Sequence, residues 1–290
     1  MSVARETADR FNRISEVYDE TRQPLTREAI DRATEILRAD GVRRILEAGV
    51  GTGRIALPLQ QRKFKIYGVD VAKKMLMKAN EKGVQNLIIA DANHLPIRDK
   101  QVDAAILAHV IHLLENPELT FQSLGRVAVK EIVAFVRKRD DVPAMDDGRA
   151  SLRENFRRVA AELGYELPDR PGGWWAGFRK EREFLSRSPP TELLTIEDRE
   201  IVTTMRERIS FFEKRAYGHP TELPEQQFRR IMKRVAKSMD LDREIRYRRA
   251  EQMAIWRLPR QSRTAASRGD ARQRTATSLT IESRRSSRLS

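Results

Sequence analysis

Short apolar runs alternate with amphipathic segments through the first half of this chain. The apolar runs cover residues 42–48, 64–69, 87–90, 102–108 and 131–136. Apolar residues recur at helical spacing in most of the intervals between them. Repeated strand–helix units of this length predict an α/β fold, with a doubly wound, seven-stranded and mostly parallel sheet. The run at 102–108, which is apolar apart from Asp103, is typical of a strand at the centre of such a sheet.

The pattern changes after residue 137, and this change suggests how the chain is organised. Residues 1–40, with an amphipathic helix at 25–38, predict a helical cap. The main domain is expected at 41–258, with a helical insert at about 145–240 before the last two strands. Within 138–258 we expect helices at 150–163, 198–214 and 224–239, a loop at 168–177, a short strand at 191–196 and a final strand at 246–258.

The carboxyl-terminal segment has a different composition from the rest of the chain. The whole chain has a net charge of +14, and residues 259–290 contain eight arginines against Asp270 and Glu282. This segment is rich in Ser, Thr and Ala and has no aromatic residue. Because such a segment buries too little apolar surface to offset the entropy of ordering, we expect a disordered tail. It would serve either as a solubilising tail or as a tether to nucleic acid.

Several classes of protein are excluded by composition. The chain has no cysteine, which removes disulfides, thiolate metal sites and cysteine nucleophiles, and fits a cytoplasmic location. The longest apolar run, 104–114, is about half the length of a membrane span. The first ten residues lack the apolar core of a secretory signal. The four histidines, His94, His109, His112 and His219, show no metal-binding spacing, so we expect no metal.

The segment Ile45 to Arg54 runs a predicted strand into a turn with glycines at 49, 51 and 53. Glycines at this junction let a ligand lie against bare backbone, next to the unpaired N–H groups of the following helix. A dinucleotide site of the G-x-G-x-x-G type would need its third glycine at position 54, which is Arg54. The turn therefore favours a different nucleotide-type ligand.

Acidic residues stand at three successive strand ends, at Glu47, Asp70 and Asp91. Glu47 lies two residues before the first glycine, where a carboxylate would suit a cationic ligand better than a pyrophosphate. Asp70 closes the second strand and could accept hydrogen bonds from ribose hydroxyls, a feature shared with NAD-binding proteins. Asp91 follows the third strand, where its simplest alternative role is to cap a helix.

Together these segments resemble the class I S-adenosylmethionine-dependent methyltransferases, in particular the small-molecule group (UbiE-like, or methyltransferase type 11). Residues 47–53 match the family's E/D-x-G-x-G-x-G turn. Residues 70–76 are similar to its D-x-S-x-x-M-L run, with Ala72 in place of serine, and residues 89–99 to its D-A-x-x-L-P-F-x-D segment. The resemblance covers residues 11–137 well. The sequence lacks the P-G-G motif that the family has before the fifth strand.

The resemblance implies S-adenosylmethionine as the cofactor. By this likeness, Asp91 and Ala92 would contact the adenine, and Asp70 would contact the ribose. Val71 and Met75 would either line the adenine site or simply pack in the core. Segment 17–22 resembles a family segment that lies over the cofactor. The implied cofactor-binding residues are Tyr18, Arg22, Glu47, Gly49, Gly51, Gly53, Asp70, Val71, Met75, Asp91, Ala92 and His109. Arg22 has a surface ion pair as its alternative role.

His109 and His112 follow the predicted fourth strand and are the candidate catalytic residues. By the resemblance, His109 would border the methionine part of the cofactor, and His112 would lie near the methyl group. Either could act as a general base near neutral pH. Packing or helix capping is the alternative for both. The insert would complete the acceptor pocket, with Trp174, Trp175 and Phe178 as candidate lining residues or as core residues.

We therefore expect a methyltransferase that acts on an unidentified, probable small-molecule acceptor. An RNA or protein methyltransferase is the main alternative, because helix 224–239 presents a basic face and the tail is basic. Against methylation of base amino groups, the fourth strand lacks an N/D-P-P-aromatic turn and continues as His109-Val110-Ile111-His112. A non-catalytic cofactor-binding protein is the third alternative. The oligomeric state stays open.

Overall fold

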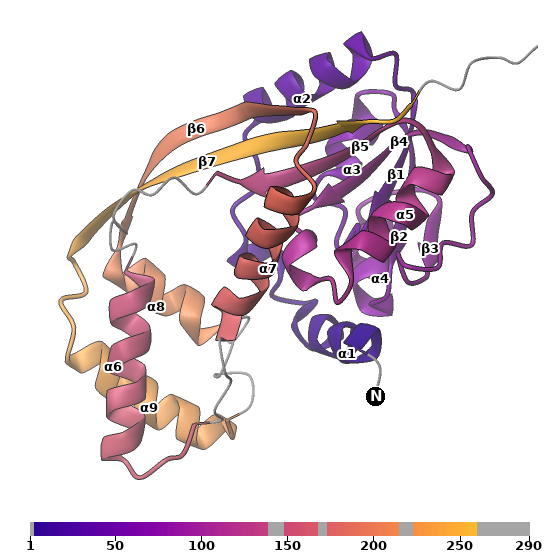
Figure 1. The fold of residues 1–290 in the computed structure, drawn as a ribbon. Coiled ribbons are helices and arrows are strands. Elements are labelled where there is room, and N and C mark those ends of the chain that lie inside the picture. Colours follow the sequence, from indigo (N-terminus) through magenta and orange to yellow (C-terminus); the bar gives the residue numbers. More distant parts are fainter. Residues whose placement is uncertain (1–2, 139–147, 168–172, 215–222, 260–290) are drawn as a thin grey trace, which may run out of the picture. The chain divides into compact units, whose positions relative to one another are not determined.

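The computed structural model describes residues 3–138, 148–167, 173–214 and 223–259. The predicted tail lies outside these residues. The described residues contain a seven-stranded sheet with the strand order β3-β2-β1-β4-β5-β7-β6 (Figure 1). The strands are β1 (Arg44–Ala48), β2 (Lys65–Asp70), β3 (Leu87–Ile89), β4 (Val102–Ala108), β5 (Ala128–Arg137), β6 (Glu192–Thr204) and β7 (Glu244–Arg257).

The sheet is mostly parallel, which confirms the predicted fold class. β1 pairs in parallel with β2 and β4, and the parallel pairing continues to β3 on one side and to β5 on the other. β7 is antiparallel to both β5 and β6. Successive strands are first added on one side of β1, out to β3. From β4 onward they are added on its other side. In doubly wound sheets, ligands bind at this switch point, outside the carboxyl ends of the strands.

Helices cover both faces of the sheet. On one face, α2 (Arg27–Ala39), α3 (Ala56–Gln61) and α4 (Lys73–Glu81) pack on a core that includes Ile45, Ile106 and Phe135. On the other face, α5 (Pro117–Val127) and α7 (Gly173–Arg187) pack on Leu46, Ala105 and Leu107. Alternate residues of β1 and β4 thus enter opposite cores, because side chains alternate along a strand.

The amino-terminal segment packs beside α4. Helix α1 (Val3–Ile14) and the short helix η1 (Asp19–Thr21) precede α2. Ile14 is buried with Ala72 and Met75, and Phe11 and Tyr18 pack against this small cluster. The sequence pattern did not predict α1. This segment covers the end of the sheet where the glycine turn lies, since Asp19 reaches Thr52 within that turn.

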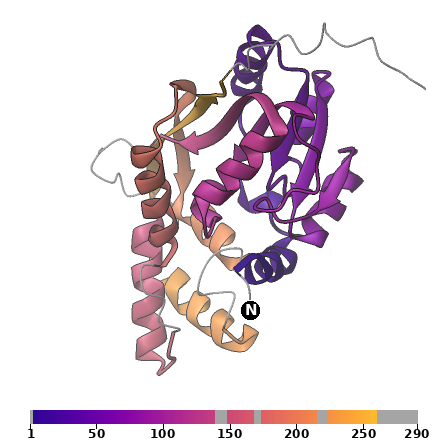
Figure 2. The ribbon, with the colours of Figure 1, turned by 45° about the vertical axis from the view of Figure 1, so that its right-hand side comes forward.

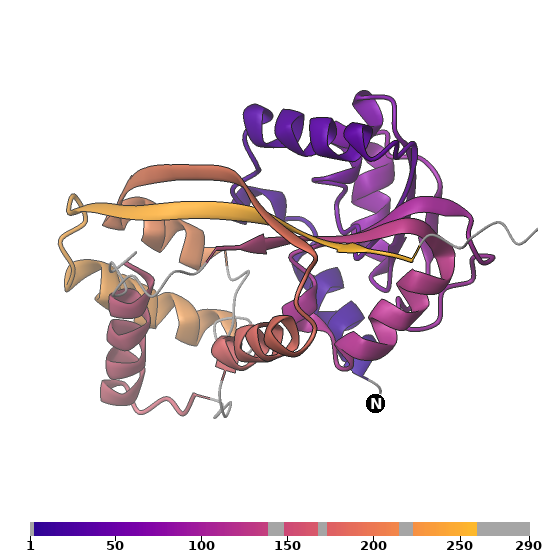
Figure 3. The ribbon, with the colours of Figure 1, turned by 45° about the horizontal axis from the view of Figure 1, so that its top comes forward.

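The last two strands are the longest in the sheet and extend beyond its other strands as a ribbon (Figure 3). Around the far end of this ribbon lie α6 (Arg149–Glu162), α8 (Met205–Glu213) and α9 (Glu225–Lys237), with α6 and α9 side by side (Figure 2). Their buried apolar residues form a third core that includes Phe156, Ile231 and Ile245. In the sequence, α6 and α7 precede β6, and α8 and α9 come between β6 and β7.

Two predicted boundaries in this half of the chain are wrong. The predicted helix at 198–214 begins only at Met205, because residues 198–204 continue β6 and pair with β7. Thr204 and Glu207 form a capping box that starts α8. The predicted loop at 168–177 is wrong from Gly173 onward, where α7 begins. Pairing with a distant strand decides the first case, and local periodicity gives no sign of it.

Candidate active site

The glycine turn forms an open cradle at the carboxyl end of β1. Gly49, Gly51 and Gly53 all have left-handed backbone angles, with φ of +74°, +55° and +79°. A Cβ atom on Gly49 would lie 2.5 Å from Val110 Cγ2, whereas one on Gly51 would meet nothing within 4 Å. The turn therefore requires glycine at position 49 for packing. At Gly51 it leaves open space where a ligand could approach the backbone.

Glu47 carries a buried carboxylate next to this cradle. The residue is only 2% exposed, and its Oε2 has no hydrogen-bond partner among the described residues. Burial, then the negative charge of Asp70, raises the pKa of Glu47 well above its usual value. An unpartnered buried carboxylate is unfavourable, and a cationic group would compensate it. The orphaned oxygen and the open backbone at Gly51 together fit a positively charged nucleoside.

Asp70 ties the end of β2 to the glycine turn. Its Oδ2 accepts a hydrogen bond from Gly51 N at 2.8 Å, and its Oδ1 accepts one from Ala72 N at 2.8 Å. Burial raises the pKa of Asp70, and these two N–H donors act in the opposite direction. Since each carboxylate oxygen can accept two hydrogen bonds, acceptor capacity is left for ribose hydroxyls. Val71 is half-buried beside it.

Asp91 and Ala92 lie after β3, on the same edge of the sheet. Asp91 Oδ1 accepts a hydrogen bond from Asn93 N at 2.9 Å, so this carboxylate stabilises its own turn. Both residues are half-buried. This bond lies within a turn and is not the helix cap that was the alternative for Asp91. It occupies one of the two carboxylate oxygens.

Side-chain contacts connect the amino-terminal segment to the glycine turn. Thr52 Oγ1 donates a hydrogen bond of 2.6 Å to Asp19, and Lys82 Nζ forms an ion pair with the same carboxylate. The Arg22 guanidinium lies 4.6 Å from the centre of the Tyr18 ring. Met75 is buried in the packing between α1 and α4, as expected for a core residue. Tyr18 and Arg22 thus stand in the segment that approaches the cradle.

His109 lies at the tip of β4 in a left-handed conformation, with φ of +57°. Its Nε2 is 3.7 Å from Oε2 of Glu251, a fully buried residue of β7. The His109 side chain is 32% exposed. Desolvation, then the guanidinium groups of Arg137 and Arg54, lowers the pKa of His109 well below its usual value. His109 is therefore neutral at physiological pH.

His112 lies in the short helix η2 (Ile111–Leu113), under helix α7. Its ring stacks on Phe178 with centroids 4.3 Å apart and an interplanar angle of 23°. Its Nδ1 is 3.5 Å from Oε2 of Glu181, a nearly buried residue of α7. Phe178 was predicted as a lining residue and contacts the candidate base directly. The side chains of Trp174 and Trp175 lie outside the described residues.

Sequence reasoning missed a group of charged residues beside His109. Arg249 Nε lies 3.1 Å from Glu251 and 3.6 Å from Glu197, and all three residues are nearly buried. Arg54 donates a hydrogen bond to the backbone oxygen of Gln23 and so joins this group to the amino-terminal segment. The charged residues in Arg-Arg-Ala-Glu (248–251) are typical of an exposed edge strand. Only the pairing of β7 between β5 and β6 shows that one side of it is buried.

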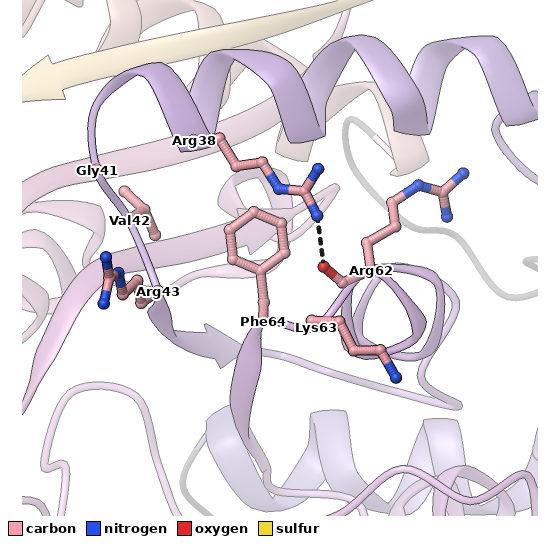
Figure 4. Close-up of a pocket in the computed structure, with 7 residues that line it drawn as sticks. All are labelled: Arg38, Gly41, Val42, Arg43, Arg62, Lys63 and Phe64. Atoms are coloured by element: carbon pink, nitrogen blue, oxygen red, sulfur yellow. Dashed lines mark hydrogen bonds between the residues drawn. The ribbon is translucent and has the colours of Figure 1, made fainter.

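A basic pocket lies at the opposite edge of the sheet, away from the strand tips described above. Figure 4 shows its lining, with Arg38, Arg43, Arg62 and Lys63 around Phe64. Arg38 donates a hydrogen bond of 2.9 Å to the backbone oxygen of Arg62, and Arg62 also contacts Asp31. Arg38 therefore binds a carbonyl group at the end of α3, and Arg62 ties that end to α2. The pocket is remote from the glycine cradle.

The described residues offer neither a metal cluster nor a membrane-spanning helix. No group of three or more His, Asp or Glu side chains there could hold a metal ion. None of the helices within the described ranges is long and apolar enough to cross a membrane.

The sheet order, the glycine cradle and the acids at three strand tips define an α/β domain that binds a nucleoside cofactor. In agreement, residues 46–133 match the model of the methyltransferase domain family. Residues 46–133 are thus a methyltransferase domain, and the cofactor of this domain is S-adenosylmethionine.

Similar proteins include a phosphatidylethanolamine N-methyltransferase of Cereibacter sphaeroides, which is 28% identical over 163 residues. That match covers 48% of this chain and 80% of the relative. An uncharacterised protein of Methanocaldococcus jannaschii is 39% identical over 97 residues, which is 33% of this chain and 45% of that protein. The solved structure of the YcgJ protein from Bacillus subtilis aligns with 82% of this chain and all of that chain, at 16% identity and a TM-score of 0.47.

Proposed function

We propose that this methyltransferase acts on a small-molecule acceptor that binds between the tip of β4, helix α7 and the amino-terminal segment. The observation that carries this proposal is the contact of α7 with η2. Phe178 and Glu181 of α7 cover His112, so the insert supplies both an apolar wall and a charged group beside the strand tip. A wall this close to the tip suits a compact acceptor better than a polymer. The relative named as a phosphatidylethanolamine N-methyltransferase supports the same class of acceptor.

The cofactor roles follow from the residues around the cradle. We propose that Glu47 faces the cofactor's ammonium group and that Asp70 accepts the ribose hydroxyls. Asp91, through its free oxygen, and Ala92 would face the adenine. Gly49, Gly51 and Gly53 would let the cofactor lie against backbone, while Tyr18 and Arg22 cover it. Val71 would border the adenine, and Met75 would support this wall from the core.

When bound, the cofactor supplies an activated methyl group on a positively charged sulfur. The chain's own residues then need to hold the acceptor in line with that group and to exclude water. Glu47 would fix the end of the cofactor nearest the β4 tip by charge pairing. Where the acceptor must lose a proton, a base beside the strand tip would take it. No nucleophilic residue is required for this chemistry.

An RNA or protein acceptor is the second candidate function, favoured by the exposed face of α9. Arg229, Arg230, Lys233, Arg234 and Lys237 are all exposed and lie opposite the buried face of that helix. RNA binding through such a face would be tight at low salt and would weaken steeply as salt rises. A binding titration with RNA at several salt concentrations separates this function from the first.

The direct test is methyl transfer from labelled cofactor to fractions of metabolites, RNA and protein. A small-molecule acceptor requires label in the metabolite fraction. Label confined to RNA or protein would overturn the proposal, and transfer to no fraction would favour a cofactor-binding protein without catalysis. The cofactor roles are tested by calorimetry with S-adenosylhomocysteine. Asp70→Ala should abolish binding while the protein stays folded, and wild-type affinity in that variant would reject the site.

A further inference from the structure

The two histidines after β4 face opposite sides of the sheet. Glu251, the partner of His109, lies on β7 two residues from Met253, which belongs to the core under α2 and α3. Glu181, the partner of His112, lies on α7 three residues from Phe184, which belongs to the core under α5 and α7. Each imidazole therefore has a buried carboxylate from a different element behind it. The two environments differ in what surrounds that carboxylate.

The carboxylate behind His109 is already shared by cations. Arg249 Nε is 3.1 Å and Arg137 Nε is 3.5 Å from Oε1 of Glu251. The guanidinium groups of Arg137, Arg54 and Arg249 all disfavour a positive charge on His109. A group held neutral in this way is a weak proton acceptor. His109 is better suited to packing and hydrogen bonding than to taking a proton.

His112 has a simpler environment. Its Nδ1 has no hydrogen-bond partner among the described residues, and Glu181 Oε2 lies 3.5 Å from it, slightly beyond a formed hydrogen bond. Among the described residues, Glu181 from α7 is the ionisable group that faces His112, and His109 interacts with His112 only electrostatically. The side chains of His112 and Glu181 are only 14% and 9% exposed, and Phe178 fixes the ring plane. Catalytic hydrogen bonds are often this long before substrates bind.

We propose that Glu181 is a positioning residue that holds His112 as the proton acceptor of methyl transfer, an inference that rests on the function proposed above. A carboxylate at Nδ1 keeps the ring proton on that nitrogen and leaves the lone pair of Nε2 free. The acceptor's lone pair forms a bond to the methyl carbon while the carbon–sulfur bond breaks, with its electron pair passing to sulfur. The acceptor's proton moves to His112 Nε2. The resulting imidazolium is stabilised by Glu181 and later releases its proton to water.

Nitrogen-15 NMR of the full chain tests this pairing without any acceptor. The chain has only four histidines, so single His→Gln variants assign every ring signal. In the wild type, the neutral form of His112 should carry its proton on Nδ1. Glu181→Gln should change the ring signals of His112, because the carboxylate that faces Nδ1 is replaced by an amide. A proton on Nε2 in the wild type, or unchanged His112 signals in Glu181→Gln, would overturn the proposal.

Glu251→Gln is the matched control, because it removes the carboxylate behind the other histidine. It should change the signals of His109 and leave the signals of His112 in place. If Glu181→Gln fails to fold, the tautomer in the wild type still decides the question, since it needs no substitution. Phe178→Leu provides a second variant that removes the ring stacking and keeps the carboxylate.

A kinetic readout separates positioning from mere packing once the labelled-methyl screen has supplied an acceptor. Glu181→Gln should lower kcat about 10- to 100-fold, with KM for the cofactor nearly unchanged, and should shift the acidic limb of the pH profile. An equal rise in KM with constant kcat would contradict the positioning role. These results are independent of the cofactor-site variants, so a failed pairing and a failed methyltransferase assignment are distinguishable.

Discussion

The sheet from β1 to β5 and the ribbon of β6 and β7 differ in how directly their sequence encodes their structure. In the first region, the cradle depends on backbone freedom at Gly49, Gly51 and Gly53, and only glycine adopts such angles without strain. In the second, charged residues such as Arg249 and Glu251 are buried because β7 lies inside the sheet and the segment before α2 covers this face, where Gln23 and Pro24 accept hydrogen bonds from Arg249. The glycine turn therefore leaves a local signature in the sequence, whereas the proposed acceptor side depends on contacts between distant residues. Four predictions test this division.

The largest effect is expected at Gly51. Gly51→Val would introduce a side chain into the open space of the cradle at a left-handed backbone angle. We expect affinity for S-adenosylhomocysteine to fall by at least about 100-fold in calorimetry, because the ligand loses contact with bare backbone. Gly164→Val is the matched control in the other region. It has φ of +73° and equally open space, so it should cost similar stability and leave binding intact.

Glu47→Gln should weaken cofactor binding by about 10-fold or more and, at the same time, stabilise the free protein. The pKa of Glu47 is raised in the folded state, so its ionised form is unfavourable at pH values above that pKa. The variant should melt about 2–4 °C higher for each kcal/mol of burial cost that it removes at pH 7. Below about pH 4.5, Glu47 is protonated in both the folded and the unfolded wild-type protein, so the difference in melting temperature between wild type and variant should vanish. A lower melting temperature at pH 7 would contradict this account.

His109→Gln should reduce the acid sensitivity of folding. Because the folded protein lowers the pKa of His109, the unfolded chain takes up this proton first as the pH falls below about 6.5. The stability that the neutral ring provides is present above that pH and is lost progressively below it. Thermal melts at pH 7.5 and 5 should show a smaller drop in the variant, by a few degrees. The exposed His94→Gln should not change the drop.

The smallest effect is expected on the exposed face of α9. Replacing Arg230, Lys233 and Lys237 together by Ala should change the melting temperature by no more than about 2 °C, because isolated surface charges contribute little. Cofactor affinity should be unchanged. A large loss of methyl transfer to RNA in this variant would move the acceptor assignment towards the second candidate function.

The sequence predicted the strands β1 to β5 within a few residues, and β4 at its observed bounds. It did so because apolar periodicity and glycine positions act locally. It failed at residues 198–204, where charged residues that fit a helix face instead pair with β7. It also could not anticipate Glu181, since nothing near residue 181 indicates that α7 returns to His112. Contacts between distant residues create the acceptor side.

The place of β7 in the sheet has a consequence for synthesis of the chain. Among the described residues, β7 is the last strand in the sequence, and it hydrogen-bonds to both β5 and β6. During translation, β6 therefore emerges without its neighbour and β5 with only one of its two, while β1 to β4 already have theirs. A nascent chain could assemble its nucleoside cradle before residue 244 leaves the ribosome. The carboxylate behind His109 arrives only afterwards, so ligand-binding competence can precede a finished fold on the ribosome.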